Sequence, residues 1–340
     1  MPAYSNTAAL PRNEIKAFVV QGRGINEANI GGKILPRYGV DRRTSHILKA
    51  TIAGAQMMRP LTDMYIKKAG ANIERMNMTL GDDTFTITTR AREVLIPDEV
   101  EADFKAGDYA SIEALAAQQA QDTIDQTDEL LIANAIFNTS NFGAAASPAV
   151  NYTRTNIATM NPVRDFFAAI EAVREKGEQP NTIVIPTLVW QLMRQATLVK
   201  DSVAGVNGFN PVLTANVTVD GLLAIFQPEG IEQILIGRNR YNTAADGATP
   251  AFTKYWSSSY VWVGRAGTAF SSKENGLETV SGVGANVFWE TPDFAGNGVG
   301  VFTYRDETRM SNVVRTLTTA SPYIANANAG TLIATNYSAS

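Results

Sequence analysis

The sequence has 340 residues, 45% hydrophobic and 18% charged, so it can bury a substantial core and lacks the composition of a disordered chain. It contains no cysteine and one histidine, which excludes disulfides, iron–sulfur clusters and zinc sites built from cysteine or histidine clusters. The net charge of −4 argues against a nucleic-acid binder, and no apolar stretch is long enough to predict a signal peptide or a membrane span, so we expect a soluble protein.

Charge is distributed unevenly along the chain. Residues 1–75 contain 12 Lys and Arg against 5 Asp and Glu, a net of +7, whereas residues 76–130 contain 3 against 13, a net of −10. Successive segments of opposite charge attract each other, either within one chain or between neighbouring chains. The pattern favours a pairing role over two unrelated solvated surfaces.

The chain begins with a segment that predicts little structure of its own. Residues 1–33 are polar and rich in Gly and Asn, with one short apolar patch at Ala17–Val20. A segment of this kind is typical of an arm that needs a partner surface to become ordered.

Extended chain is predicted next, over residues 34–95. The clearest strand is Thr84–Ile96, because Phe85 and Ile87 alternate with threonines. The stretch from Lys49 to Leu80 is compatible with a long β-hairpin. A hairpin alone is marginally stable in water, so this one would have to lie on another surface.

Residues Asp108–Asn138 form the strongest helix prediction. Asp108 is a plausible N-cap, and no Gly or Pro interrupts the segment. About 30 residues at 1.5 Å each give a helix of roughly 45 Å, long enough to cross a domain. Its apolar stripe at spacings of three and four, with one gap of seven, comprises Tyr109, Ile112, Ala116, Ala120, Ile124 and Leu131.

A connection of small and polar residues, 143–161, marks a candidate domain boundary before a compact mixture of helices and strands. Asn161 and Pro162 predict the start of a helix with Phe166 on its apolar face and Gly177 at its end. The later predicted elements are strand Thr182–Ile185, helices Leu188–Gln195 and Val219–Phe226, strand Ile231–Ile236, extended Tyr255–Arg265, and strands Gly298–Tyr304, Ser311–Thr318 and Thr331–Thr335.

A search for chemistry finds no catalytic residue, no cofactor-binding loop and no metal site. His46 has no carboxylate nearer in sequence than Asp41 to orient it as a base. The glycines after Phe18–Val20 do not complete a dinucleotide fingerprint, because Glu27 takes the third glycine position. An enzyme that uses carboxylates alone remains an alternative, with Glu229, Glu232 and Asp246 as candidates.

The order of elements resembles the major capsid proteins of tailed bacteriophages, which share the Hong Kong 97 type of fold. The stretch TFTITTRAREVLIPDEVEADF resembles the strand leading back from the family's extension loop, and IEALAAQQAQDTIDQTDELLIANAIFNTSNF is similar to its spine helix. Residues 217–264 resemble a run in the axial domain, and residues 299–337 resemble the strands that return to the peripheral domain.

This resemblance implies an α+β fold with a definite division of the chain. Residues 1–35 would be an amino-terminal arm, 36–95 an extended β-hairpin loop, 96–155 with 299–340 a peripheral domain that contains the spine helix 108–138, and 156–298 an axial domain.

The implied function is that of a major capsid protein, which self-assembles into the hexamers and pentamers of an icosahedral head around double-stranded DNA. Implied partners are other copies of the chain, a scaffolding protein, a portal, a decoration protein and packaged DNA bound without sequence specificity, but no membrane. The protein would be found in the virion, after assembly in the host bacterial cytoplasm. The main alternative is a tail-tube or other ring-forming virion protein.

The functional site would then be the interface between subunits. We expect the basic loop and arm of one copy to lie over the acidic spine region of a neighbour. The basic side chains are Arg42, Arg43, Arg59, Lys67, Lys68 and Arg75, and the acidic ones are Asp98, Glu99, Glu101, Asp103 and Asp108.

Overall fold

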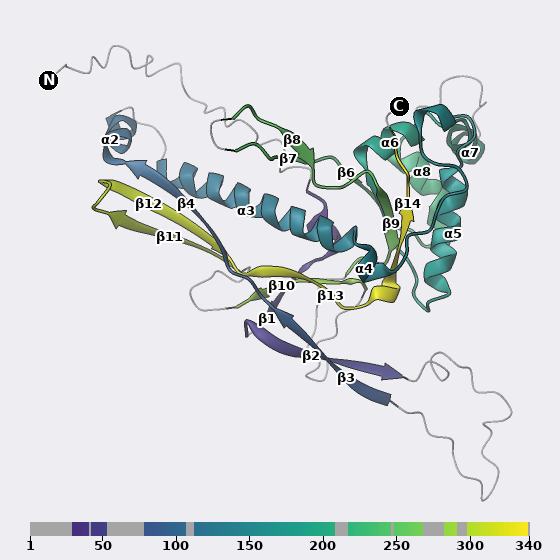
Figure 1. Ribbon diagram of the computed structural model, residues 1–340, viewed down its shortest axis with the longest axis horizontal. Coiled ribbons are helices and arrows are strands. Elements are labelled where there is room, and N and C mark those ends of the chain that lie inside the picture. The colour runs from purple at the N-terminus through teal and green to yellow at the C-terminus, as the bar shows by residue number, and fades with distance from the viewer. Residues whose placement is uncertain are drawn as a thin grey trace, which may run out of the picture.

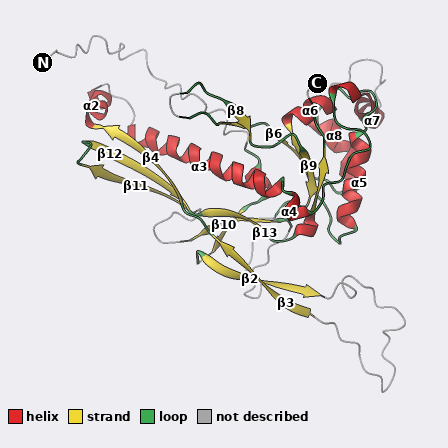
Figure 2. Ribbon diagram, in the orientation of Figure 1, coloured by secondary structure: helices red, strands yellow, loops and turns green. Residues whose placement is uncertain are grey.

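Helix α3 (Ile112–Ile136) runs through the middle of the molecule in the computed structural model (Figure 1). A three-stranded sheet lies along one end of this helix, and a compact block of helices and strands lies at the other (Figure 2). The structure describes residues 29–40, 42–52, 78–106, 112–207, 217–245, 248–267, 282–290 and 298–338.

The sheet beside α3 has the strand order β11 (Val299–Asp306), β12 (Ser311–Thr318) and β4 (Arg90–Pro97), all antiparallel. Helix α2 (Asp98–Ala106) follows β4 directly. The face toward α3 buries Ile96 and Val314 against Ala116. Ala116, Ala120 and Ile124 are all buried, which confirms that part of the predicted apolar stripe.

The compact block is built on a four-stranded sheet, and its strands have apolar residues without alternation because both faces are covered. Ile183 and Ile185 face the helices, where Phe166 and Phe226 complete one core, whereas Val184 faces the end of α3. The strand order is β14 (Gly330–Ala334), β9 (Tyr260–Gly264), β5 (Thr182–Pro186) and β6 (Gln233–Gly237). The helices are α5 (Pro162–Arg174), α6 (Thr187–Met193), α7 (Thr197–Asn207) and α8 (Val219–Phe226).

The predicted start of α5 is confirmed in atomic detail. The side-chain oxygen of Asn161 accepts a hydrogen bond from the backbone N–H of Arg164 at 3.1 Å, with Pro162 at the first helical position. Gly177 has a φ of 88° shortly after the helix ends, a left-handed conformation that glycine adopts without strain.

A third sheet joins the two ends of the molecule. Strand β1 (Arg37–Val40) pairs in parallel with β10 (Gly284–Trp289), and β10 pairs antiparallel with β13 (Ala320–Ile324). Two short helices, α1 (Gly31–Ile34) and α4 (Thr139–Phe142), precede β1 and follow α3, and a small hairpin is formed by β7 (Arg240–Asn242) and β8 (Phe252–Lys254).

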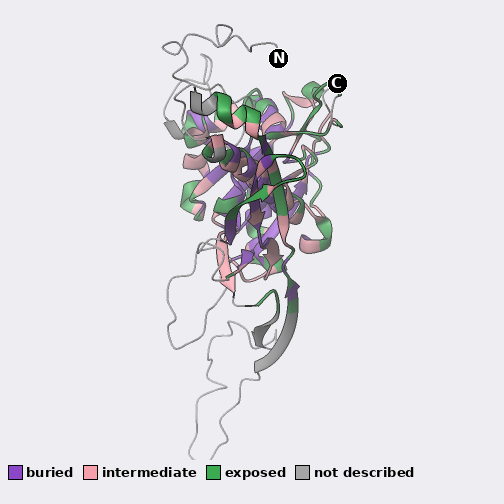
Figure 3. Cartoon of the chain, turned by 90° about the vertical axis from the view of Figure 1, so that its left-hand side faces the viewer, coloured by how far each residue is buried: buried purple, intermediate pink, exposed green. Residues whose placement is uncertain are grey.

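The hairpin that the sequence suggests is present, with β2 (Thr44–Ile52) antiparallel to β3 (Met78–Thr86). Its register pairs Thr44 with Thr86 at the root and Ile52 with Met78 at the far end of the described part. The hairpin projects from the body below the β10–β13 sheet (Figure 1), whereas buried residues gather in the body (Figure 3).

Several sequence predictions need correction. The predicted strand Thr84–Ile96 is two strands, because β3 ends at Thr86 and β4 begins at Arg90. Between them Ile87 is 1% exposed and packs with Phe85 against the β10 residue Val287, which anchors the change of direction. Helices α2 and α7 were not predicted, and the proposed N-cap Asp108 lies outside the described residues.

The division into arm, loop, peripheral part and axial part stays an expectation. Two strands form hydrogen-bonded pairs with strands from a range assigned to a different part. Strand β14, from the range assigned to the peripheral part, pairs with β9 in the sheet of the compact block. Strand β10, from the range assigned to the axial part, pairs with β1 and β13. The two parts are therefore tied by exchanged strands.

Candidate subunit interface

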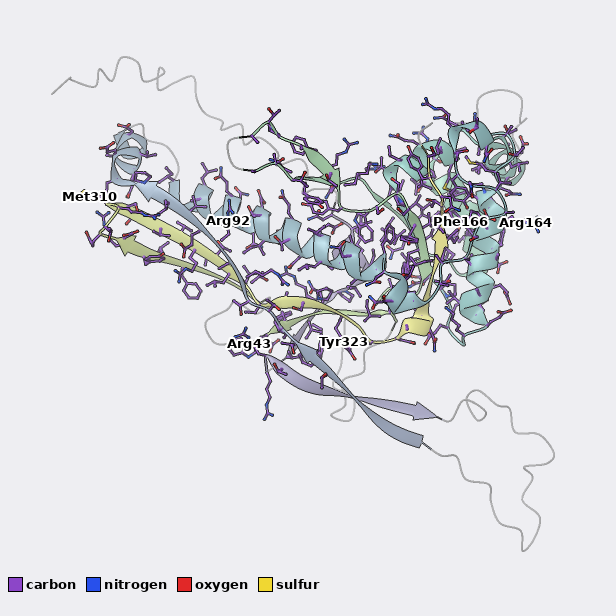
Figure 4. The ribbon with its side chains drawn as sticks, in the orientation of Figure 1. Arg43, Arg92, Arg164, Phe166, Met310 and Tyr323 are labelled. Carbon is purple, nitrogen blue, oxygen red and sulfur yellow. The ribbon has the colours of Figure 1, made fainter. Side chains whose placement is uncertain are left out.

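The predicted basic residues that the structure describes lie at the root of the hairpin. Arg42 and Arg43 are exposed there. The carbonyl of Arg43, which Figure 4 labels, accepts a hydrogen bond from the N–H of Ile87 at 2.9 Å. This bond joins the two chain connections into the hairpin to each other. Arg59, Lys67, Lys68 and Arg75 lie outside the described residues.

The predicted acidic residues lie at the opposite end of the sheet, on α2, far from the hairpin in Figure 1. Arg305 donates to Asp98 with Nη2 at 2.6 Å from Oδ2, and Asn312 donates to Glu101 at 2.6 Å, so both carboxylates have partners in their own chain. Asp108 lies outside the described residues.

Two of these carboxylates, Glu99 and Asp103, are exposed. Because they are four residues apart on α2, they share one side of the helix. Among the described residues, the structure therefore does not bring Arg42 and Arg43 together with the acidic residues of α2 within one chain. Of the described acidic residues of the prediction, Glu99 and Asp103 are the exposed ones.

Part of the acidity of α3 is satisfied internally, which the sequence analysis missed. Arg37 from β1 lies with Nη2 at 2.8 Å from Oδ2 of Asp128 and 3.8 Å from Oδ1 of Asp125. Burial raises the pKa of Asp128 above its ordinary value, and the Arg37 guanidinium opposes that rise. Asp128, whose side chain is 8% exposed, therefore belongs to the fold and is not available to a neighbouring subunit, whereas Asp125 stays 39% exposed.

Exposed apolar side chains gather at the α2 end of the molecule. The described residues include eight large hydrophobic side chains that are exposed, and only Phe167 and Phe252 lie elsewhere. A concentration of this kind on one surface is typical of an interaction site. The six are Leu95, Val100, Val301, Phe302, Tyr304 and Met310, and Figure 4 shows Met310 at the tip of the sheet.

The strand register explains how this surface is formed. On the sheet face away from α3, one row contains Phe302, Arg315 and Glu93, and the next contains Tyr304, Val313 and Leu95. Arg315 donates to Glu93 at 2.6 Å and lies 4.9 Å from the centre of the Tyr304 ring. The ion pair is satisfied within this face, where Val313 is buried and Phe302, Tyr304 and Leu95 are 38–44% exposed.

Strand β11 is the edge strand of this sheet as far as the described residues show. Among the described residues β11 pairs with β12 alone. Its neighbours Val301 and Phe302 point to opposite faces and are 51% and 38% exposed. An edge strand of this kind presents backbone donors and acceptors as well as apolar side chains to a partner.

The described residues do not assemble a site for carboxylate catalysis or a metal. Glu229 forms an ion pair with Arg174 at 2.7 Å, Glu232 is exposed, and Asp246 lies outside the described part of the chain. Within that part, no three acidic or histidine side chains are grouped so that they could hold a metal ion. No described helix combines the length and hydropathy needed to cross a membrane.

No protein-family model and no curated protein sequence matches the chain. Solved structures do. A phage-related protein from Bordetella bronchiseptica RB50 has a TM-score of 0.61 at 19% identity, covering 91% of this chain and 92% of that chain. The capsid of cyanophage P-SCSP1u has a TM-score of 0.55 at 9% identity, with coverages of 98% and 94%.

A third similar structure is the holo-SrpI encapsulin complex of Synechococcus elongatus PCC 7942, with a TM-score of 0.52 at 11% identity and coverages of 97% and 93%. Identities this low carry information about the fold alone. All three alignments cover more than nine tenths of this chain. The chain therefore has the α+β fold of tailed-phage capsid proteins, the Hong Kong 97 type.

Proposed function

We propose that the chain is the major capsid protein of a tailed double-stranded DNA bacteriophage and that it assembles into hexamers and pentamers of an icosahedral head. The observation that carries the proposal is the hairpin β2–β3, whose two strands pair only with each other among the described residues. It projects beyond the cores of its own chain (Figure 1). Because a two-stranded hairpin is marginal in water, a surface of another copy is needed to stabilise it.

The α2 end of the molecule supplies a surface that suits this need. Among the described residues it has β11 as an edge strand and a sheet face with the partly exposed aromatic side chains Phe302 and Tyr304. A projecting element at one place and a receptive surface at another give a head-to-tail contact, which closes into a ring when the rotation between copies permits. Hexamers and pentamers are rings of this kind.

Charge has a secondary part in this contact. Asp98 and Glu101 already have partners in their own chain, so Glu99 and Asp103 are the acidic residues that would face the basic loop of a neighbour. Exposed ion pairs contribute about 0–1 kcal/mol each. Apolar burial at about 25 cal/mol per Å² therefore dominates the strength of the contact, and charge mainly guides its approach and register.

The remaining features of the proposal follow from this role. The protein catalyses no reaction and requires no cofactor. Its partners are other copies of itself, a scaffolding protein, a portal, a decoration protein and packaged DNA that it does not read by sequence. A net charge of −4 suits a shell that encloses DNA without binding its phosphates tightly. The protein resides in the virion after assembly in the host bacterial cytoplasm.

Negative-stain electron microscopy of the purified protein, with sedimentation velocity of the same sample, tests the proposal. Closed shells are expected. Tubes or open rings would assign the chain to the tail or to another virion structure. A monomer at all concentrations, with hairpin amides as protected as those of the body, would refute the proposal outright.

A further inference from the structure

A buried carboxylate on α3 holds the start of the described chain. Glu129 is 3% exposed, and both of its oxygens accept hydrogen bonds from N–H groups. Oε2 accepts from the backbone N–H of Gly31 at 2.7 Å, and Oε1 accepts from that of Ile30 at 3.1 Å. Oε1 also accepts from Nε1 of Trp256 at 2.7 Å. One side chain thus joins α1, α3 and the segment that follows β8.

Among the described residues, the hydrogen bonds to this carboxylate all come from N–H groups. Among the described residues, the arginine of this region, Arg37, pairs with the neighbouring Asp128 and Asp125. Burial raises the pKa of Glu129, and the hydrogen bonds from Trp256, Ile30 and Gly31 oppose that rise. A buried polar group is tolerated when its hydrogen bonds are made, and it strongly disfavours any arrangement that leaves them unmade.

The surroundings of Glu129 fit the backbone at Ile30 and Gly31 closely. A Cβ added at Gly31 would lie 2.6 Å from Oε2 of Glu129, so only glycine allows this close approach. Beside it, Ile34 and Leu35 are fully buried against residues of the α3 end that include Ile136. Polar and apolar contacts therefore select the same position for residues 30–35.

We propose that Glu129 is a latch that fixes the amino-terminal segment on the spine helix and thereby sets the direction in which the hairpin β2–β3 leaves the body. It is a positioning residue, and the inference rests on the proposed shell function for its biological meaning. The sequence analysis treated residues 1–35 as an arm that needs a partner surface. For residues 30–35, the partner surface lies within the same chain.

The path of the chain links the latch to the hairpin. From α1 the backbone continues into β1, which is held by its parallel pairing with β10 and by the Arg37–Asp128 ion pair. Strand β2 then begins at Thr44, close after β1. Because Glu129 and Asp128 are adjacent on α3, one turn of the spine helix fixes both α1 and β1. Releasing α1 would free the first of the two connections that orient the hairpin.

Hydrogen–deuterium exchange on the full chain, read by mass spectrometry, tests the latch. In Glu129→Ala the amides of residues 30–35 should exchange about tenfold faster or more, because a buried acceptor has been removed. Peptides from the middle of α3 and from β5 should keep their protection. Trypsin should cleave faster after Lys33, which is exposed but lies within α1.

Two further variants make the result decisive. Glu171→Ala removes a glutamate whose side chain is 64% exposed on α5, and it should change neither readout. Gly31→Ala leaves Glu129 in place but separates it from α1, and it should reproduce the exchange pattern of Glu129→Ala even if that variant folds poorly. Unchanged protection of residues 30–35 in Gly31→Ala or in a folded Glu129→Ala would overturn the proposal.

Electron micrographs of the same samples test the role of Glu129 separately from the capsid proposal. If wild type forms closed shells and the Glu129→Ala variant forms mainly open or irregular assemblies, the latch acts in assembly as proposed. Regular Glu129→Ala shells would show that the latch does not set the hairpin. If wild type forms no shells while Glu129→Ala still loses protection at residues 30–35, the latch stands and the capsid proposal fails.

Discussion

Replacing Arg37 by methionine gives a sharp test of how the amino-terminal strand is held. The Asp128 side chain is 8% exposed and that of Arg37 is 29% exposed, with the closest N–O distance at 2.8 Å. Removing one partner of a buried ion pair costs about 3–5 kcal/mol, since the other charge remains buried without compensation. Because Arg37 is partly exposed, we expect a smaller loss than this, about 2–3 kcal/mol of unfolding free energy.

The loss should depend on pH with a definite sign. Burial raises the pKa of Asp128 above its ordinary 3.8, so the folded chain binds this proton more tightly than the unfolded chain. That contribution to stability is complete below 3.8 and is lost as pH rises through the folded pKa. Without Arg37 the folded pKa rises further, so the variant loses more at neutral pH and recovers as the pH falls.

Urea unfolding of unassembled subunits at about pH 7.5 and about pH 5 measures both effects. The matched control is Arg92→Met, since Arg92 is exposed on β4 (Figure 4) and its replacement should stay within about 0.5 kcal/mol of wild type. Equal losses for the two variants would refute the reasoning. So would an Arg37→Met deficit that is the same at both pH values.

Three further predictions concern the surface and the core. Phe302→Ser, at 38% exposure, should reduce shell formation while changing subunit stability by less than about 1 kcal/mol; normal shell yield by sedimentation would contradict a docking role. Glu99→Lys with Asp103→Lys should slow assembly, followed by light scattering, at low salt but not at high salt; salt-independent slowing would remove the charge argument. Phe166→Ala should reduce the free energy of unfolding in urea by about 3–5 kcal/mol, because it empties a fully buried site, whereas Phe167→Ala at the partly exposed neighbouring position should reduce it clearly less. Equal losses would mean that the core around α5 is misassigned.

The elements that could be predicted from the sequence are those whose signals are local. Helix α8 and strand β12 have the predicted bounds, and the Asn161–Pro162 cap begins α5 as expected. In each, the apolar period or the capping residues lie within the element itself. The part of the α3 stripe formed by Ala116, Ala120 and Ile124 is confirmed for the same reason, since these residues recur at helical spacing.

Elements defined by distant partners could not be predicted in this way. Strand β10 was not predicted from the sequence, and in the structure it is paired with β1 on one side and β13 on the other. The break between β3 and β4 depends on Ile87 finding the β10 residues Ala285 and Val287, about 200 positions later in the chain. Tertiary contacts decide such cases, and local propensity does not contain them.

For the interface, the sequence gives the charges of the residues but not their partners. The excess of acid in residues 76–130 is real, yet Asp98 pairs with Arg305 and Asp128 with Arg37, at separations of 207 and 91 residues. The exposed apolar surface was missed because Val301 and Phe302 look like ordinary strand residues. Only the position of β11 at an edge distinguishes them from core side chains.

The two ends of the subunit differ in a way that bears on how copies associate. Near the start of the chain segment that leads to the hairpin, Arg37 pairs with Asp128, and Glu129 accepts hydrogen bonds from the backbone of Ile30 and Gly31, all inside a single chain. At the receptive end, intrachain ion pairs such as Arg305–Asp98 hold the sheet and α2 before any partner arrives. Association between surfaces that are already ordered loses less conformational entropy. More of the favourable free energy of apolar burial therefore contributes to affinity. A variant such as Glu129→Ala, in which α1 is released, should therefore still associate through β11 and α2. Its hairpins would point in many directions, so the assemblies would lack the uniform curvature that a closed shell requires.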